Sequence, residues 1–157
     1  KFNFLPHKIM TIPIIRFNFP TPITIGSRTR LKKFLISIIK KEGKRLAELQ
    51  YIFCSDDYLL GINQQYLGHN DFTDIITFDL AEKGKPINAE IYISVDRVKD
   101  NARQFSSTLK DELQRVMIHG VLHLCGYKDK TPKDQAQMRK KEDQYLQAYK
   151  TFHVETK

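Results

Sequence analysis

The segment from Val116 to Leu124 constrains the fold more than any other, because it is apolar on every side except for two histidines and one glycine. A helix that is apolar all round is normally buried on every side. The rest of the chain must therefore supply enough packed elements to enclose this helix. With 157 residues the chain is long enough to bury a sizeable core without disulfides, and we expect residues 1–157 to form a single domain.

Short β-branched segments and amphipathic segments alternate along the rest of the chain. We expect strands at residues 11–19, 48–55, 74–80 and 89–95, the last two forming a hairpin. We expect helices at residues 27–41, 56–66, 96–105, 108–125 and 131–149, from their apolar spacing and capping residues. Pro13 places the first strand at a sheet edge. This pattern predicts a mixed α/β or α+β domain.

The net charge of +8 is concentrated in the first 50 residues, which hold eleven Lys and Arg but only two Asp and Glu. Many of these cations lie on or just after the predicted 27–41 helix: Arg28, Arg30, Lys32, Lys33, Lys40, Lys41, Lys44 and Arg45. Such a surface attracts polyanions, RNA or DNA foremost. A solvated helix face that keeps the protein in solution explains the same charges equally well.

The sequence also indicates a cellular compartment. No apolar run is long enough to span a bilayer, and residues 1–6 lack the apolar stretch of a secretion signal. The chain has only two cysteines, Cys54 and Cys125, and one disulfide could not hold a domain of this size together. We therefore expect reduced, buried thiols. We therefore expect a cytoplasmic protein that does not contact membranes. The chain has no initiator methionine, and Met10 could be the natural start.

The candidate chemistry lies on the 108–125 helix and the turn after it. His119 and His123 are four residues apart, so their side chains lie on one helix face and could bind one metal ion. Gly126 is expected to end the helix, which would bring the carboxylate of Asp129 near the same ion. Two histidines and one carboxylate leave an open coordination position, as in catalytic zinc sites. The alternative is a pair of core histidines bonded to backbone carbonyls.

Two further residues of this helix bear on the chemistry. In zinc proteases a Glu follows the first histidine directly and acts as general base, but here that position is Gly120. This disfavours a peptidase and leaves the base unassigned. Glu112, seven residues before His119, could orient a ligand or carry a proton, although an acid is favourable in any first helical turn.

These residues resemble a known family. Residues 119–127 are similar to the H-G-x-L-H-L-x-G-Y-D-H signature of the YbeY family, which are bacterial metal-dependent endoribonucleases of rRNA maturation. Residues 63–78 are similar to its N-x-x-Y…T-D-V-L-S-F segment, and residues 89–94 to its G-D-I-x-I-S strand. The match covers about residues 48–145. It implies a single zincin-like α+β domain, with a mixed four-stranded sheet and helices packed around a buried metal-bearing helix.

The resemblance also implies a function. It implies a zinc-dependent, single-strand-preferring endoribonuclease of rRNA processing and ribosome assembly, whose partners are single-stranded RNA, rRNA and ribosomal particles, with no nucleotide cofactor. His119, His123 and Asp129 would bind one Zn²⁺ per chain and form the catalytic site. Whether water or the RNA's own 2′-hydroxyl attacks stays open. Another metal-dependent hydrolase, such as a peptidase, and a non-catalytic assembly factor with a structural metal are the alternatives.

Several positions bear on substrate binding. Tyr66, Phe72 and Tyr127 could stack on splayed bases, although aromatic residues are more often part of a core. The family usually has an Arg, a natural phosphate contact, where this chain has Leu67.

His69 or Arg103 could replace that Arg. The family's third metal ligand is usually His where this chain has Asp129, and a carboxylate is a legitimate zinc ligand. Its Gly-Asp pair reads Ala89-Glu90 here, which is a mild change.

Overall fold

The computed structural model describes residues 11–155, so Met10 and the segment inspected for a secretion signal lie outside the described residues. The strands are β1 (Ile14–Asn18), β2 (Leu46–Cys54), β3 (Ile75–Asp79) and β4 (Ile87–Ser94). The helices are α1 (Arg28–Lys41), α2 (Asp56–Leu67), α3 (Val95–Gln104), α4 (Leu109–Leu124) and α5 (Pro132–Thr151). All nine elements were expected from the sequence, and most of their bounds agree within about two residues.

The four strands form one mixed sheet in the order β1-β2-β4-β3. Strands β1, β2 and β4 are parallel, whereas β3 runs antiparallel to β4, so the predicted hairpin is confirmed. Strand β1 lies at an edge, where the preceding Pro13 removes no ladder hydrogen bond. The domain is therefore of the α+β class, with a mixed four-stranded sheet and five helices.

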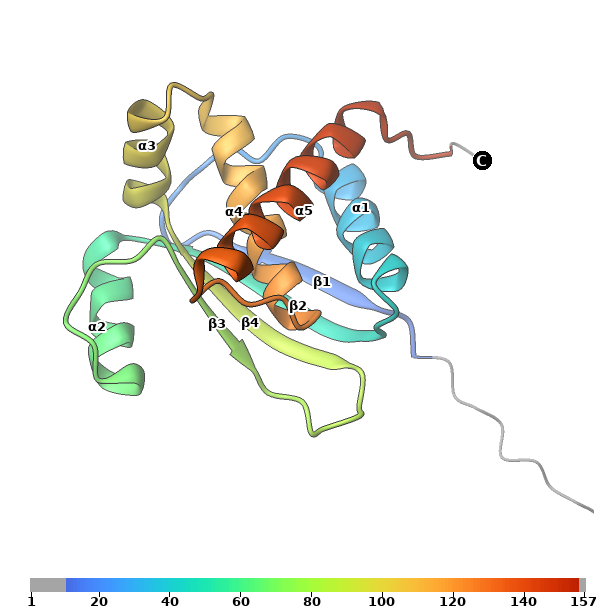
Figure 1. Cartoon of the computed structure of the whole chain (residues 1–157), viewed down its shortest axis with the longest axis horizontal. Helices are drawn as coiled ribbons and strands as arrows, with labels where there is room; N and C mark the ends of the chain where they lie inside the picture. Colours follow the sequence, from blue (N-terminus) through green and yellow to red (C-terminus); the bar gives the residue numbers. More distant parts are fainter. Residues whose placement is uncertain (1–10, 156–157) are drawn as a thin grey trace, which may run out of the picture.

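Helices cover both faces of the sheet (Figure 1). The main core lies between one face and helices α1 and α4, and α5 packs across α4 from outside. A smaller cluster under α2 occupies the opposite face, with Leu59, Ile62 and Ile76 at its centre. Side-chain caps start the helices as expected: Ser27, Ser55, Thr108 and Thr131 each accept a hydrogen bond from a backbone N–H in the first turn.

Helix α4 is not buried on every side. Its apolar residues are buried, and at Gly120 the helix lies so close to the sheet that a Cβ atom would come within 2.8 Å of Ile91 Cδ1. The face that carries the histidines stays partly open, with 20% of the His119 side chain and 28% of the His123 side chain exposed. The pattern predicted a fully enclosed helix, and the structure leaves one face free for chemistry.

Other expectations from the sequence can be compared directly. Cys54 is buried and Cys125 is half-buried, and both thiols are free. Among residues 11–155, no helix combines the length and apolar character needed to cross a membrane.

Candidate metal centre

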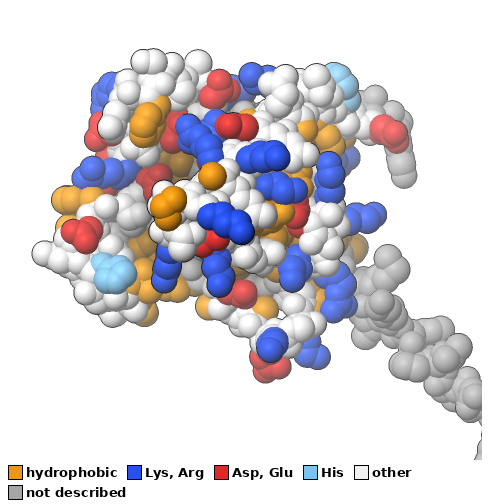
Figure 2. Space-filling view, viewed as in Figure 1, with side chains coloured by type: hydrophobic (Ala, Val, Ile, Leu, Met, Phe, Trp, Pro, Cys, Tyr) orange, Lys and Arg blue, Asp and Glu red, His pale blue; other side chains and the backbone are white. Residues whose placement is uncertain are grey.

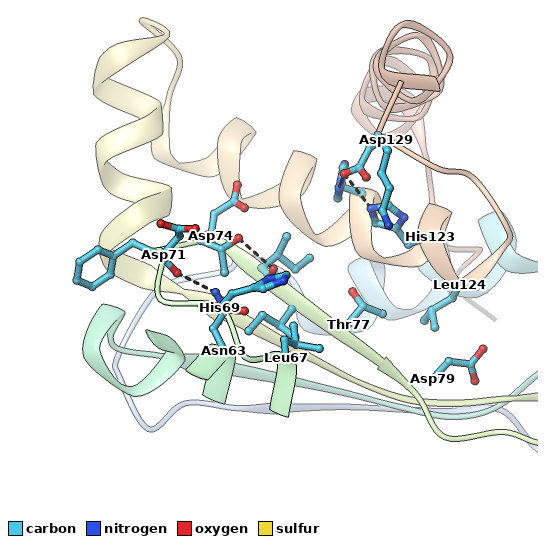
Figure 3. A pocket seen from close by; sticks show the side chains of 16 residues that line it. Asn63, Leu67, His69, Asp71, Asp74, Thr77, Asp79, His123, Leu124 and Asp129 are labelled. Carbon is cyan, nitrogen blue, oxygen red and sulfur yellow. Dashed lines mark hydrogen bonds and ion pairs between the residues drawn. The ribbon is translucent and has the colours of Figure 1, made fainter. Parts of the chain in front are cut away.

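His119, His123 and Asp129 come together at the C-terminal end of α4. The two imidazole rings lie one turn apart, with centroids separated by 4.5 Å. Gly126 adopts a φ of 105°, which turns the chain back so that Asp129 faces the helix. Asp129 Oδ2 lies 3.4 Å from His119 Nε2. It lies 3.2 Å from Nε2 of His123, and Figure 3 shows these two side chains facing each other. Each of the three side chains offers a ligand atom within 4.8 Å of the others, which is the arrangement a single metal ion requires.

The second nitrogen of each imidazole already has a partner. His123 Nδ1 lies 2.9 Å from the backbone oxygen of Tyr127, and His119 Nδ1 lies 2.9 Å from Glu142 Oε2. A carbonyl oxygen only accepts hydrogen bonds, so Nδ1 of His123 donates and its Nε2 keeps a lone pair. The alternative of two core histidines bonded to backbone carbonyls holds only for one nitrogen of His123. Its Nδ1 contacts the backbone oxygen of Tyr127, whereas its Nε2 is directed at Asp129. This donor set fits a divalent zinc ion.

The charges around His119 favour a cation. Burial lowers the pKa of His119, but the Glu142 hydrogen bond and the negative charges of Glu142 and Asp129 outweigh burial and raise it. Nearby Asp74 is half-buried, and burial is the main cause that raises the pKa of its carboxyl group. The raised pKa of His119 reflects the negative charge around it, which a bound metal cation would neutralise.

A cavity of about 720 Å³ opens beside the three residues. Helix α2, the loop after it and β3 form the opposite wall (Figure 3). Asn63 shapes that wall, because its side-chain amide donates to the backbone oxygen of Asp71 and its backbone oxygen accepts from the backbone N–H of His69. The cavity is wide enough for a nucleotide, and four carboxylates line it: Asp71, Asp74, Asp79 and Asp129.

His69 and Arg103, the two residues that could replace the family's Arg at position 67, lie in different surroundings. Leu67 lines the cavity, and so does His69, which points into it from the loop after α2 (Figure 3). Arg103 lies on α3, is paired with Asp100 and does not line this cavity. Lys130 also lines the cavity, directly after Asp129. His69 and Lys130 are thus the residues placed to contact a phosphate.

The three aromatic candidates have different surroundings. Phe72 lines the cavity with 47% of its surface exposed, and the guanidinium of Arg97 lies 4.6 Å from its ring centre. Tyr66 is exposed but packs edge-on against Phe78 and does not line the cavity.

Tyr127 serves a different purpose. Its hydroxyl donates to Glu42 Oε2 at 2.8 Å, and the ammonium group of Lys141 lies 5.7 Å from its ring centre. Tyr127 therefore braces the turn that carries Asp129 instead of offering a free face to a base.

Glu112 does not orient either histidine directly. It is buried in the first turn of α4 and lines a second, smaller cavity of about 340 Å³, which shares His119 and Asp129 with the first. Burial raises the pKa of Glu112, and the charge of Arg115 opposes this shift.

Sequence reasoning missed Glu142, the hydrogen-bond partner of His119. No motif marks this residue, which follows His119 by 23 positions. A weaker signal was present: Met138, Glu142, Tyr145 and Tyr149 recur at helical spacing and form the buried face of α5. A carboxylate on a buried helix face needs a partner, and that requirement could have drawn attention to it.

The basic helix α1 lines neither cavity. Arg30 is engaged in packing, because its guanidinium donates to the backbone oxygens of Phe152 and Tyr149 and covers the Tyr149 ring. Lys33 and Lys40 are exposed. The charge on α1 therefore serves partly to fasten the C-terminal helix and partly faces solvent.

Comparison with known proteins gives a consistent result. The family model described as Endoribonuclease YbeY matches residues 22–150. A protein named Endoribonuclease YbeY from Flavobacterium psychrophilum is 49% identical over 141 residues, covering 90% of this chain and 98% of the relative. Another of that name from Cytophaga hutchinsonii is 51% identical over 133 residues, covering 85% and 93%.

A solved structure agrees. The solution structure of TM1509 from Thermotoga maritima aligns with a TM-score of 0.61 and 35% identity, covering 87% of this chain and 89% of that protein. The chain therefore belongs to the YbeY family and is a hydrolytic endoribonuclease.

Proposed function

We propose that this chain is a zinc-dependent endoribonuclease that cuts single-stranded RNA during rRNA processing and ribosome assembly. In this proposal His119, His123 and Asp129 bind one Zn²⁺ and form the catalytic site. The observation that carries it is the convergence of two imidazole Nε2 atoms on one carboxylate oxygen beside an open cavity. When bound, zinc would polarise a phosphoryl oxygen and lower the pKa of a nearby water molecule.

The cavity walls suggest how the RNA strand is held. Carboxylates outnumber the single lysine among the lining residues, so a phosphodiester would be repelled from most of the wall. His69 and Lys130 would offset this repulsion by donating hydrogen bonds to the phosphate. The half-exposed ring of Phe72 would stack on an unpaired base, which supports a preference for single strands.

The wider surface supports RNA as the partner. Lys and Arg side chains are spread over much of the face that carries α5 and α1 (Figure 2). Such a face would attract rRNA and ribosomal particles over a distance of about 8–10 Å at physiological salt. The free thiols of Cys54 and Cys125 fit a reducing compartment, so we place this activity in the cytoplasm.

One observation disfavours the peptidase alternative. A side chain at position 120 would meet Ile91 Cδ1 at 2.8 Å and Ile75 Cδ1 at 3.0 Å. Position 120 thus faces the sheet and not the cavity, so it could not supply the general base of a zinc protease even with a Glu there.

The test combines metal analysis with a cleavage assay. Purified protein is loaded with zinc and given one RNA in single-stranded and fully paired form. We expect about one zinc per chain and faster cleavage of the single strand. The same protein is offered a panel of peptides as a control for specificity. Tight binding of ribosomal particles without cleavage at any metal loading would instead establish a non-catalytic assembly factor.

A further inference from the structure

We propose that Glu142 is a positioning residue of the metal centre, which holds His119 in the tautomer whose Nε2 can bind the metal. The inference rests on the proposed metal site but not on RNA cleavage. It concerns a residue outside the three ligands, on a different helix and 23 positions away along the chain.

The contact to His119 is short and sheltered. Glu142 lies on α5 with only 7% of its side chain exposed, and its Oε2 atom is 2.9 Å from His119 Nδ1. Water competes poorly with a hydrogen bond in such surroundings, so the contact is stronger than it would be at the surface. A buried carboxylate also needs donors, and the imidazole N–H is one of them.

A second contact prevents Glu142 from turning away. Its Oε1 atom accepts a hydrogen bond from Arg115 Nη1 at 3.1 Å. Arg115 lies on α4 one turn before His119, and its Nη2 atom is held in turn by Asp143 at 2.7 Å. Both oxygens of Glu142 are thus fixed by neighbouring side chains of α4, and the carboxylate has one orientation available.

This arrangement determines which imidazole nitrogen is protonated. A neutral imidazole carries one proton, and His119 has a carboxylate near each ring nitrogen. Glu142 is closer to Nδ1, at 2.9 Å, and nearly buried, whereas Asp129 is 3.4 Å from Nε2 with 42% of its side chain exposed, so the proton is retained on Nδ1. Nε2 then keeps its lone pair directed at Asp129. An imidazole without such a partner prefers the proton on Nε2, which would block the metal. Carboxylate–histidine pairs of this kind orient ligands in metal sites generally.

The two histidines are positioned by different means. His123 is held by a backbone carbonyl, which no substitution removes, whereas His119 depends on a side chain. A substitution at Glu142 can therefore change the tautomer of His119 without removing any of the three ligand side chains.

A purely structural role must be distinguished from positioning. The Arg115 pair could merely fasten α5 to α4, and Glu142 would then contribute only to stability. Asp143 provides the matched control, because it contacts the same arginine without contacting His119, and 59% of its side chain is exposed. Asp143→Asn weakens the ion pair between Arg115 of α4 and Asp143 of α5 but keeps Glu142, the hydrogen-bond partner of His119.

The experiment uses two readouts that need no RNA. The ¹⁵N chemical shifts of the His119 ring in metal-free protein at mildly alkaline pH report the tautomer, and competition with a chromophoric chelator reports zinc affinity. For Glu142→Ala we expect a shift toward the Nε2-protonated form and zinc binding weakened by about 10–100-fold. Glu142→Gln should lose less, because its amide oxygen still accepts from Nδ1. Asp143→Asn should match the wild type in both readouts.

The outcomes separate the possibilities. A folded Glu142→Ala protein with wild-type tautomer and zinc affinity would overturn the proposal, as would an equal loss of affinity in Asp143→Asn. If Glu142→Ala does not fold, the tautomer of His119 in the wild type and the zinc affinity of Glu142→Gln test the proposal instead. A His119 protonated on Nε2 in the wild type would refute the proposal. Absence of zinc binding in the wild type would instead overturn the metal site itself.

Discussion

Asp129 Oδ2 lies 3.2 Å from Nε2 of His123, and Asp129 stands at the sequence position where the signature that this chain resembles has a third histidine. A carboxylate ligand leaves the zinc complex with one positive charge fewer than three neutral imidazoles would. Such a centre polarises phosphate less and holds the cation more firmly in acid.

Replacement of Asp129 tests its role as ligand. We expect Asp129→Ala to weaken zinc affinity by at least about tenfold, or roughly 1.4 kcal/mol. Asp129→His should retain zinc and cleave RNA with an altered pH profile, because it restores the three-imidazole set. Zinc titration of both folded variants is the measurement. Unchanged affinity in Asp129→Ala would mean that this residue only caps the turn before α5.

The histidines should be needed for metal and for activity together. His123→Ala removes one Nε2 donor, and we expect zinc occupancy and RNA cleavage to fall in parallel while the circular dichroism spectrum stays native. His153→Ala is the control, because this exposed histidine follows the end of α5 and lines neither cavity. Full zinc occupancy in purified His123→Ala would show that the proposed ligand set is wrong.

The basic face of α1 should affect RNA binding without affecting the metal. We expect weaker binding and a shallower salt dependence after four charge reversals, at Lys32, Lys33, Lys40 and Lys41. Each lost phosphate contact on a single strand removes about 0.7 from the slope of log affinity against log salt. A control carries four reversals at exposed positions elsewhere: Lys83, Lys85, Lys99 and Lys110. Filter binding at several salt concentrations, with zinc analysis alongside, distinguishes an RNA contact from a merely solvated face.

Gly120 should resist substitution although it lies inside a helix. Alanine raises helix propensity by about 1 kcal/mol, but overpacking against the sheet costs about 1–3 kcal/mol. We therefore expect Gly120→Ala to lower the free energy of unfolding, since the new Cβ meets Ile91 and Ile75. Gly61→Ala in α2 is the matched control, because no atom lies within 4 Å of a Cβ there, and it should be stabilising. Chemical denaturation that shows equal gains at both positions would contradict this account.

Glu42 should make stability depend on pH in the acid range. Burial raises the pKa of Glu42, but hydrogen bonds from Tyr145, Tyr127 and Lys141 outweigh burial and lower it below 4.5. A lowered pKa in the folded state stabilises the fold above the unfolded value, and this stabilisation is lost as pH falls through the folded value.

The corresponding test is denaturation at several pH values. Glu42→Gln should be less stable than the wild type by about 1.5–3 kcal/mol at neutral pH. The difference should shrink as pH falls below about 4.5 and through the lowered pKa of the folded state, below which Glu42 is protonated in both states. Glu82→Gln, at an exposed position in the β3–β4 turn, should show no such difference. If the difference in the free energy of unfolding between the wild type and Glu42→Gln stayed constant at acid pH, the charge of Glu42 would be excluded as its source.

The sequence by itself determined the features that depend on residues close together along the chain. Caps such as Ser27 and Thr131 mark helix starts because their side chains bond to backbone groups three residues on. The spacing of His119 and His123 predicts a shared helix face for the same reason. The edge position of β1 followed from Pro13, which cannot donate to a sheet ladder.

Only the tertiary structure decided which distant side chains meet at the site. Glu142 reaches His119, and Glu42 reaches Tyr127 across 85 positions, because α5 and the end of α1 both pack against α4 and the turn after it. Tertiary packing likewise leaves one face of α4 open and places His69, but not Arg103, beside the cavity. These contacts depend on how whole helices fit against one another, which is governed by the summed shape and burial of many side chains and not by any local spacing.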